Sequence, residues 1–116
     1  MSSPTEIKLR RAENLLELRF EDGRVISLPA EYLRVESPSA EVQGHGPGQG
    51  VLVAGKRHVG ITGIEPTGNY AIRLIFSDGH DTGIYSWALL QELAREQPIR
   101  WRRYLERLQE AGLARD

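Results

Sequence analysis

Alternating apolar and polar side chains predict β-strands in the first three quarters of the chain. Residues 15–20 place leucine and phenylalanine at every second position between charged residues, and 70–76 repeat this pattern with isoleucine, leucine and phenylalanine. A period of two is typical of a strand with one buried face. Shorter runs of the same kind predict further strands at 7–11, 25–28 and 59–65.

Two Asp-Gly pairs stand directly after the clearest strands. Asp22-Gly23 separates 15–20 from 25–28, and Asp78-Gly79 follows 70–76. An Asp-Gly pair between two strand-like runs is a strong hairpin signal. Both pairs belong to an LxFxDG motif. The two copies are compatible with duplicated hairpins and equally with chance, because Asp-Gly turns after apolar strands are common.

The C-terminal third has the period of helices. Ser86 is a good cap for a helix that we expect to end near Glu96. Pro98 closes this helix and can start another, because proline is tolerated in a first turn. The apolar face of the second helix has i, i+3, i+4, i+7 spacing and consists of Trp101, Tyr104, Leu105 and Leu108.

Strands therefore come first and helices last, which indicates an α+β fold. We expect a small, mainly antiparallel β domain built from hairpins and followed by two C-terminal helices. Residues 36–50 are rich in glycine and proline and almost lack large apolar side chains, so we interpret them as a loop. The glycines around His45 do not form a Walker A loop, because no Gly-Lys-Ser/Thr closes them. We favour a flexible surface loop, and the alternative is a partner-binding loop that orders on contact.

Composition limits the classes of function. The chain has 116 residues, which fits one domain, and a net charge of −1, so no global field attracts nucleic acid or an anionic membrane. It has no cysteine, which excludes thiolate catalysis and thiolate-held metals within this chain. No apolar run reaches the length of a membrane span. We expect a cytoplasmic protein without membrane contact and with residues 1–6 as a disordered tail.

His80 lies in the densest group of potential ligands, between Asp78 and Asp81. These side chains would suit a divalent metal, or a base oriented by a carboxylate. The alternative is an ordinary hairpin turn in which Asp78 bonds its own backbone. We favour the turn, because the other two histidines, His45 and His58, lack ligand spacing to His80.

Arginines and aromatic residues alternate in 100–104. Such a stripe is found in some nucleic-acid interfaces. Here the aromatic residues fall on the apolar face and should be core, and the arginines should form a solvated face. We therefore do not expect nucleic-acid binding.

Several motifs follow one another in a specific order. They are Leu18–Gly23, Leu28-Pro29, Tyr32–Arg34, Ser37–Val42, Gly44–Gly46, Gly63–Pro66, Gly68–Tyr70, Phe76–His80 and Gly83–Trp87. Together they resemble the bacterial DUF971 family, stand-alone relatives of the N-terminal domain of gamma-butyrobetaine hydroxylase. The resemblance implies a domain at 7–97, with 98–116 as a C-terminal helix packed on it.

In the hydroxylases this domain carries a structural zinc held by three cysteines and one histidine. The resemblance assigns these ligands to Ser37, Ser39, Val42 and His80. Neutral hydroxyls are poor zinc ligands and valine is none. We therefore predict that the structural zinc is lost, which leaves weak metal binding at His80 open. The catalytic iron belongs to a separate domain, so the resemblance implies no inherited activity.

Similar domains are also fused to P-loop ATPases of iron–sulfur cluster assembly. We therefore expect a non-enzymatic binding or adaptor domain with a protein partner, accessory to iron–sulfur or metalloprotein assembly, and no cofactor. The candidate contact residues are His45, Asp78, Asp81, Ser37 and Ser39. The alternative is a metal-binding protein that uses His80 with nearby carboxylates.

Overall fold

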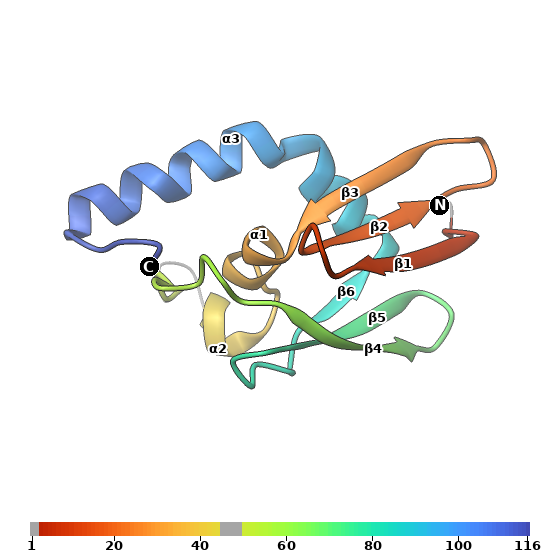
Figure 1. The fold of residues 1–116 in the computed structure, drawn as a ribbon, viewed down its shortest axis with the longest axis horizontal. Coiled ribbons are helices and arrows are strands. Elements are labelled where there is room, and N and C mark those ends of the chain that lie inside the picture. Colours follow the sequence, from red (N-terminus) through yellow and green to blue (C-terminus); the bar gives the residue numbers. More distant parts are fainter. Residues whose placement is uncertain (1–2, 45–49) are drawn as a thin grey trace.

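The computed structural model describes residues 3–44 and 50–116, which form two three-stranded antiparallel sheets and three helices (Figure 1). The first sheet has the order β1 (Glu6–Arg10), β2 (Leu15–Arg19), β3 (Val25–Pro29), and the second has the order β4 (Ile61–Thr67), β5 (Ala71–Phe76), β6 (Ile84–Ser86). The helices are α1 (Ala30–Val35), α2 (Ala40–Gln43) and α3 (Trp87–Ala111). The α+β class is confirmed.

The strand register turns the alternating apolar positions toward one core. Leu16 pairs with Leu28 in the first sheet, and Ile72 pairs with Tyr85 in the second. A single buried cluster joins side chains of both sheets, α1 and the first half of α3. The largest of these side chains are Tyr32, Tyr85, Phe76, Leu16, Leu18, Leu28, Leu33, Ile72, Leu74, Leu90 and Leu93.

The two Asp-Gly turns have the same geometry. In each, the phenylalanine N–H donates to the carbonyl four residues later at 3.0 Å, and the glycine N–H donates to the phenylalanine carbonyl at 3.0 Å. Gly23 and Gly79 both have φ 91°, which favours glycine. Each turn joins the second and third strands of a three-stranded meander that leads directly into a helix. The repeated motif thus corresponds to a repeated local structure.

Helix α3 runs through Pro98 without ending, so the expected pair of C-terminal helices is one helix. Proline removes one backbone donor and crowds the carbonyl four residues earlier. Figure 1 shows the helix changing direction between its cyan and blue parts, and a bend at proline relieves this crowding. The Tyr32 hydroxyl donates to the Leu93 carbonyl at 2.7 Å in the turn before the proline. Packing on both sides of Pro98 keeps the two halves continuous.

Three other expectations need correction. Strand β1 begins at Glu6, so the disordered tail that the sequence predicts at 1–6 does not extend to this residue. Pro66 belongs to β4 rather than to the turn after it, because β4 is an edge strand where a missing N–H costs no ladder bond. The loop at 36–50 contains the short helix α2, which Ser39 caps by accepting from the N–H of Glu41 at 3.2 Å.

A second cluster fixes the end of α3 to the segment before β4. Tyr104 and Leu108 pack with Val35 against the partly buried residues 52–54. After Gly112 the chain turns back, and its last residues bond to the backbone of Gly55 and Arg57. The second half of α3 is therefore part of the same domain. Within the described residues, no helix is both long and apolar enough to cross a membrane.

Candidate functional site

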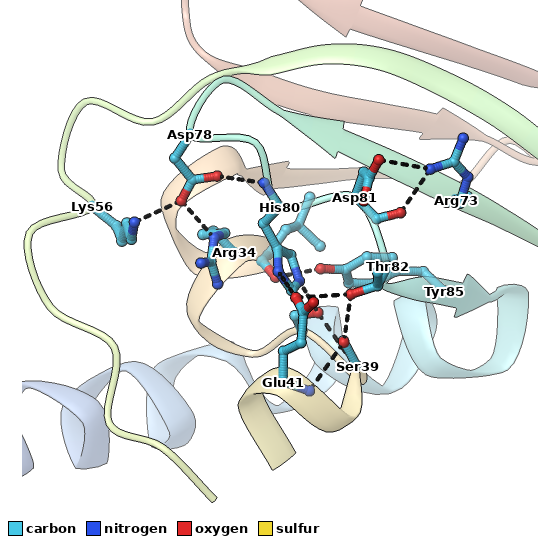
Figure 2. A network of polar contacts seen from close by, with 12 residues as sticks. Arg34, Ser39, Glu41, Lys56, Arg73, Asp78, His80, Asp81, Thr82 and Tyr85 are labelled. Atoms are coloured by element: carbon cyan, nitrogen blue, oxygen red, sulfur yellow. Dashed lines mark hydrogen bonds and ion pairs between the residues drawn. The ribbon is translucent and has the colours of Figure 1, made fainter. Parts of the chain in front are cut away.

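His80 is buried where the β5–β6 turn meets the segment between α1 and α2 (Figure 2). Its Nε2 lies 2.8 Å from the hydroxyl of Ser37, which follows α1. Its Nδ1 lies 3.0 Å from Oε2 of Glu41, in the first turn of α2. The imidazole therefore bridges two side chains that are far from it in sequence.

The partners of His80 fix where the protons lie. An ionised carboxylate only accepts hydrogen bonds, so Nδ1 carries the hydrogen and donates to Glu41. In the neutral ring Nε2 is then the acceptor, and the Ser37 hydroxyl donates to it. The Ser37 oxygen in turn accepts from the N–H of Ser39 at 3.2 Å. Every polar atom of this contact has a partner.

Ser39 and Thr82 close a second ring around Glu41. Thr82 donates its hydroxyl hydrogen to Oε2 of Glu41 at 3.0 Å. Because that hydrogen is used, Ser39 must donate to Thr82, whose oxygen lies 2.6 Å away. Ser39 completes the ring by accepting from the N–H of Glu41. The start of α2 is thus joined to the β5–β6 connection by several short bonds.

Asp78 turns away from His80's ring and toward two cations (Figure 2). Its Oδ2 accepts from Nε of Arg34 at 2.8 Å and lies 2.6 Å from Nζ of Lys56. Its Oδ1 accepts from the N–H of His80 at 3.1 Å. Both carboxylate oxygens are therefore occupied. Nη1 of Arg34 is buried without a hydrogen-bond partner among the described residues.

Asp81 does not join this cluster. Its carboxylate is half exposed and lies 3.4 Å from Arg73. The alternative grouping of Asp78, His80 and Asp81 as ligands is therefore not formed, since the two carboxylates point to different cations. His45 lies outside the described residues. In the ranges that the structure describes, no three histidine, aspartate or glutamate side chains converge as a metal site.

The surroundings shift the pKa values of His80 and Asp78. Burial lowers the pKa of His80 and the Arg34 cation lowers it further, while Glu41 acts in the opposite direction. Burial alone would raise the pKa of Asp78, but hydrogen bonds from Lys56 and Arg34 bring it well below its usual value. At neutral pH the site therefore contains a neutral imidazole and a charged carboxylate.

The side chains at the zinc-ligand positions of the resemblance do not fit zinc. Ser37, Ser39 and Val42 offer two neutral hydroxyls and an alkyl group, whereas structural zinc takes four nitrogen or sulfur ligands. His80 is the remaining candidate, and hydrogen bonds engage both of its ring nitrogens. Hydrogen bonds thus connect two of these positions directly, Ser37 and His80.

Ser37, His80 and Glu41 have the order of contacts found in a serine hydrolase, but their burial is reversed. In such a triad the serine faces the substrate and the carboxylate is buried. Here Ser37 is 0% exposed, whereas the Glu41 side chain is 61% exposed. A Cβ at Gly83 would lie 2.6 Å from the Ser37 hydroxyl, so the backbone closes the space above it. A substrate carbonyl has no route to this oxygen.

Sequence reasoning placed His80, Ser37 and Ser39 in one site through the resemblance and missed the residues that complete it. Glu41 could have been found from a local signal. Ser39 caps α2, and Glu41 is the second residue of that helix, so its side chain lies near the cap. Arg34, Lys56 and Thr82 carry none, since their contacts with the turn or with α2 span long stretches of sequence. Ser37 has no histidine near it in sequence, yet the fold brings one to it.

Comparisons with known proteins agree with this fold. An NMR solution structure is 49% identical over 100% of this chain and 91% of that chain, with a TM-score of 0.85. A second NMR solution structure is also 49% identical, covers 99% of this chain and 86% of that chain, and has the same TM-score. Among curated proteins, no relative matches.

A crystal structure from Acidithiobacillus ferrooxidans ATCC 23270, of a protein with unknown function from the DUF971 family, is 38% identical. It covers 79% of this chain and 92% of that chain, with a TM-score of 0.66. The family model described as "Gamma-butyrobetaine hydroxylase-like, N-terminal" matches residues 7–91. The chain therefore belongs to the gamma-butyrobetaine hydroxylase-like N-terminal family, which includes the DUF971 proteins.

Proposed function

We propose that this domain is a non-enzymatic protein-binding module. The observation that carries the proposal is the reversed burial of the Ser37–His80–Glu41 chain. A nucleophile must reach its substrate, and a general base must reach the proton it takes. Ser37 and the His80 ring are enclosed by α1, α2 and the β5–β6 turn, so their hydrogen bonds hold these elements together.

Charge placement supports the same proposal. Asp78 is neutralised by Arg34 and Lys56 from two other segments, and His80 is neutral by virtue of its low pKa. Polar groups satisfied in this way stabilise a surface without carrying out chemistry. The domain would then act through the side chains around this centre.

The setting we propose is iron–sulfur or metalloprotein assembly in the cytoplasm, with this domain as the adaptor. Its support is the resemblance to domains that are fused to P-loop ATPases of that process. The adaptor would then recognise a protein partner directly. It would need no metal of its own.

Two measurements on untagged protein test the proposal. In the first, p-nitrophenyl acetate and butyrate are incubated with the wild type, Ser37→Ala and the control Ser27→Ala, whose serine lies on an exposed strand position. We expect the same background rate for all three. Turnover that Ser37→Ala abolishes and Ser27→Ala retains would overturn the non-enzymatic assignment.

The second measurement identifies the partner. Proteins enriched from lysate of the source organism by the immobilised domain are purified and titrated against it by calorimetry. We expect saturable binding of at least one of them at a defined stoichiometry. If none rebinds as a purified protein, the adaptor role is contradicted.

A further inference from the structure

A small hollow lies between α2, the segment that begins at Gly50 and the second half of α3. Its volume is ≈ 170 Å³, and its apolar part is formed by Val35, Val42, Val51 and Tyr104. Figure 1 shows α2, the start of the light-green segment and the blue part of α3 at the same end of the molecule, away from the tips of the β2–β3 and β4–β5 hairpins. Tyr104 is held in place because its hydroxyl donates to the Val53 carbonyl at 2.6 Å.

Arg103 and Arg107 stand at this hollow without a counter-charge. Both side chains line it and both residues are exposed. Four residues apart on one helix, they lie on the same face, one turn from each other. Within the described ranges neither makes an ion pair, in contrast to Arg100, which pairs with Glu36 at 2.7 Å.

Among the described residues, the acids closest in sequence form no ion pair with these two arginines. Glu106 and Glu110 neighbour the two arginines along α3 but do not line the hollow. Glu36 lines it and is already bonded to Arg100. The hollow therefore combines a small apolar floor, of which Val51 is the exposed part, with two guanidinium groups that can bind a carboxylate through paired hydrogen bonds.

Size and shape decide which anion fits. Pockets for cofactors and drug-sized ligands typically measure ~300–1,000 Å³, so ≈ 170 Å³ suits one or two side chains. Nucleic acid would need exposed aromatic faces for stacking, and Tyr104 is 4% exposed. The apolar floor has no counterpart in a free phosphate. An acidic peptide with a neighbouring apolar side chain complements both parts of the hollow.

We propose that this hollow is the docking site for an acidic peptide segment of the partner protein. A glutamate or aspartate of the segment binds Arg103 and Arg107, and an adjacent leucine-sized side chain packs on the exposed Val51. The inference rests on the proposed binding function and names the surface that serves it. It also assigns a role to Arg103 and Arg107, which take no part in the hydrogen-bonded network around His80.

Fluorescence anisotropy with short labelled peptides tests the site. The probe has two adjacent glutamates flanked by leucines, and its counterparts carry glutamine for glutamate or serine for leucine. Inorganic phosphate serves as a competitor. We expect saturable binding of the acidic probe, and loss of about tenfold or more in affinity for each counterpart and for Arg103→Glu/Arg107→Glu. Phosphate should compete weakly, since it lacks the apolar group.

The matched control is Arg95→Glu/Arg102→Glu, which makes the same charge change on α3 at arginines outside the hollow. It should bind within about twofold of the wild type after correction for long-range charge. Equal losses in both double variants, tight binding of phosphate alone, or no saturable binding of the acidic probe would each overturn the site. Circular dichroism spectra of both variants confirm that the fold is retained.

Binding of the purified partner to the wild type and to Arg103→Glu/Arg107→Glu distinguishes a failure of the docking site from a failure of the proposed function. If a purified partner binds the wild type and Arg103→Glu/Arg107→Glu equally, the binding function stands and the docking site is wrong. If the double variant alone loses the partner, both stand. If no partner binds the wild type, the adaptor role fails irrespective of the peptide result.

Discussion

The hydroxyl of Ser37 lies 2.8 Å from Nε2 of His80, across 43 residues of sequence. Both side chains occupy positions that the resemblance to the hydroxylases assigns to zinc ligands. In this chain a hydrogen bond joins them, and Glu41 completes the contact on the other side of the ring. The elements that a metal would hold together are held by neutral and charge-assisted hydrogen bonds.

Removal of the Ser37 hydroxyl should weaken the fold. Ser37→Ala leaves Nε2 of His80 and the N–H of Ser39 buried without partners, so we expect a loss of about 1–3 kcal/mol in the free energy of unfolding. Ser27→Ala removes an exposed hydroxyl and should change it by less than about 0.5 kcal/mol. Urea denaturation followed by circular dichroism measures both. Equal values for the two variants would contradict a structural role for the contact.

The free energy of unfolding should decrease as the pH decreases, because the unfolded chain takes up a proton on His80. The pKa of this side chain is lowered in the fold, whereas in the unfolded chain it returns to about 6.5. Between these two values the unfolded state binds more protons, so the free energy of unfolding decreases as pH falls below about 6.5. Urea titrations between pH 8 and 5.5 should show this slope in the wild type.

Two histidine variants isolate the origin of that slope. His80→Gln removes the titrating group and should flatten the dependence on pH. His58→Gln, at a side chain that is 87% exposed, should retain it. If the slope persists in His80→Gln and disappears in His58→Gln, it originates at His58, and the prediction is contradicted.

The ion pairs of Asp78 should contribute more to the free energy of unfolding than its hydrogen bond within the turn. Asp22 and Asp78 accept the same backbone bond in equivalent turns, at 3.1 Å in both. Asp22 also pairs with Arg24, but both side chains are exposed. In contrast, Asp78 and its partners Arg34 and Lys56 are largely buried. We expect Asp78→Asn to cost about 2 kcal/mol, because it leaves Arg34 largely buried without a counter-ion. Asp22→Asn, on an exposed turn, should cost less than about 1 kcal/mol. Thermal and urea unfolding compare the pair.

A side chain at the glycine of either Asp-Gly turn should destabilise the fold. Gly23→Ala and Gly79→Ala place alanine at φ 91°, and each should lose about 1–2 kcal/mol. Gly60→Ala is the control, because its Cβ would meet Asn14 Oδ1 at an ordinary 3.5 Å and its φ is not positive. Similar losses at the two turns with little change at Gly60 support their equivalence. A neutral Gly79→Ala would contradict it.

Local patterns were sufficient for much of the fold. Alternation predicted β2 and β5 nearly to the residue, and Asp-Gly pairs predicted both tight turns. Pro98 misled the interpretation of α3, because the rule that proline ends a helix is local, whereas Trp101 and Tyr104 pack against distant residues. The four-residue helix α2 was missed, since one turn leaves no period to detect.

The candidate site was less accessible to sequence reasoning. The resemblance brought Ser37, Ser39 and His80 together, and the structure places them within one hydrogen-bonded group. Flanking acids suggested Asp81 as a partner of His80, but in the connection between β5 and β6 its carboxylate lies near Arg73 instead. The sequence analysis did not identify Glu41, because its contact with His80 joins residues that are far apart in the chain.

The most direct test of a metal-free, hydrogen-bonded centre is the free energy of unfolding of untagged protein with and without zinc. Urea titrations are run in excess chelator and with one equivalent of zinc chloride. The Ser37–His80–Glu41 network predicts the same value in both, within about 0.5 kcal/mol. Stabilisation by several kcal/mol with zinc, as structural zinc provides, or unfolding in chelator would contradict it.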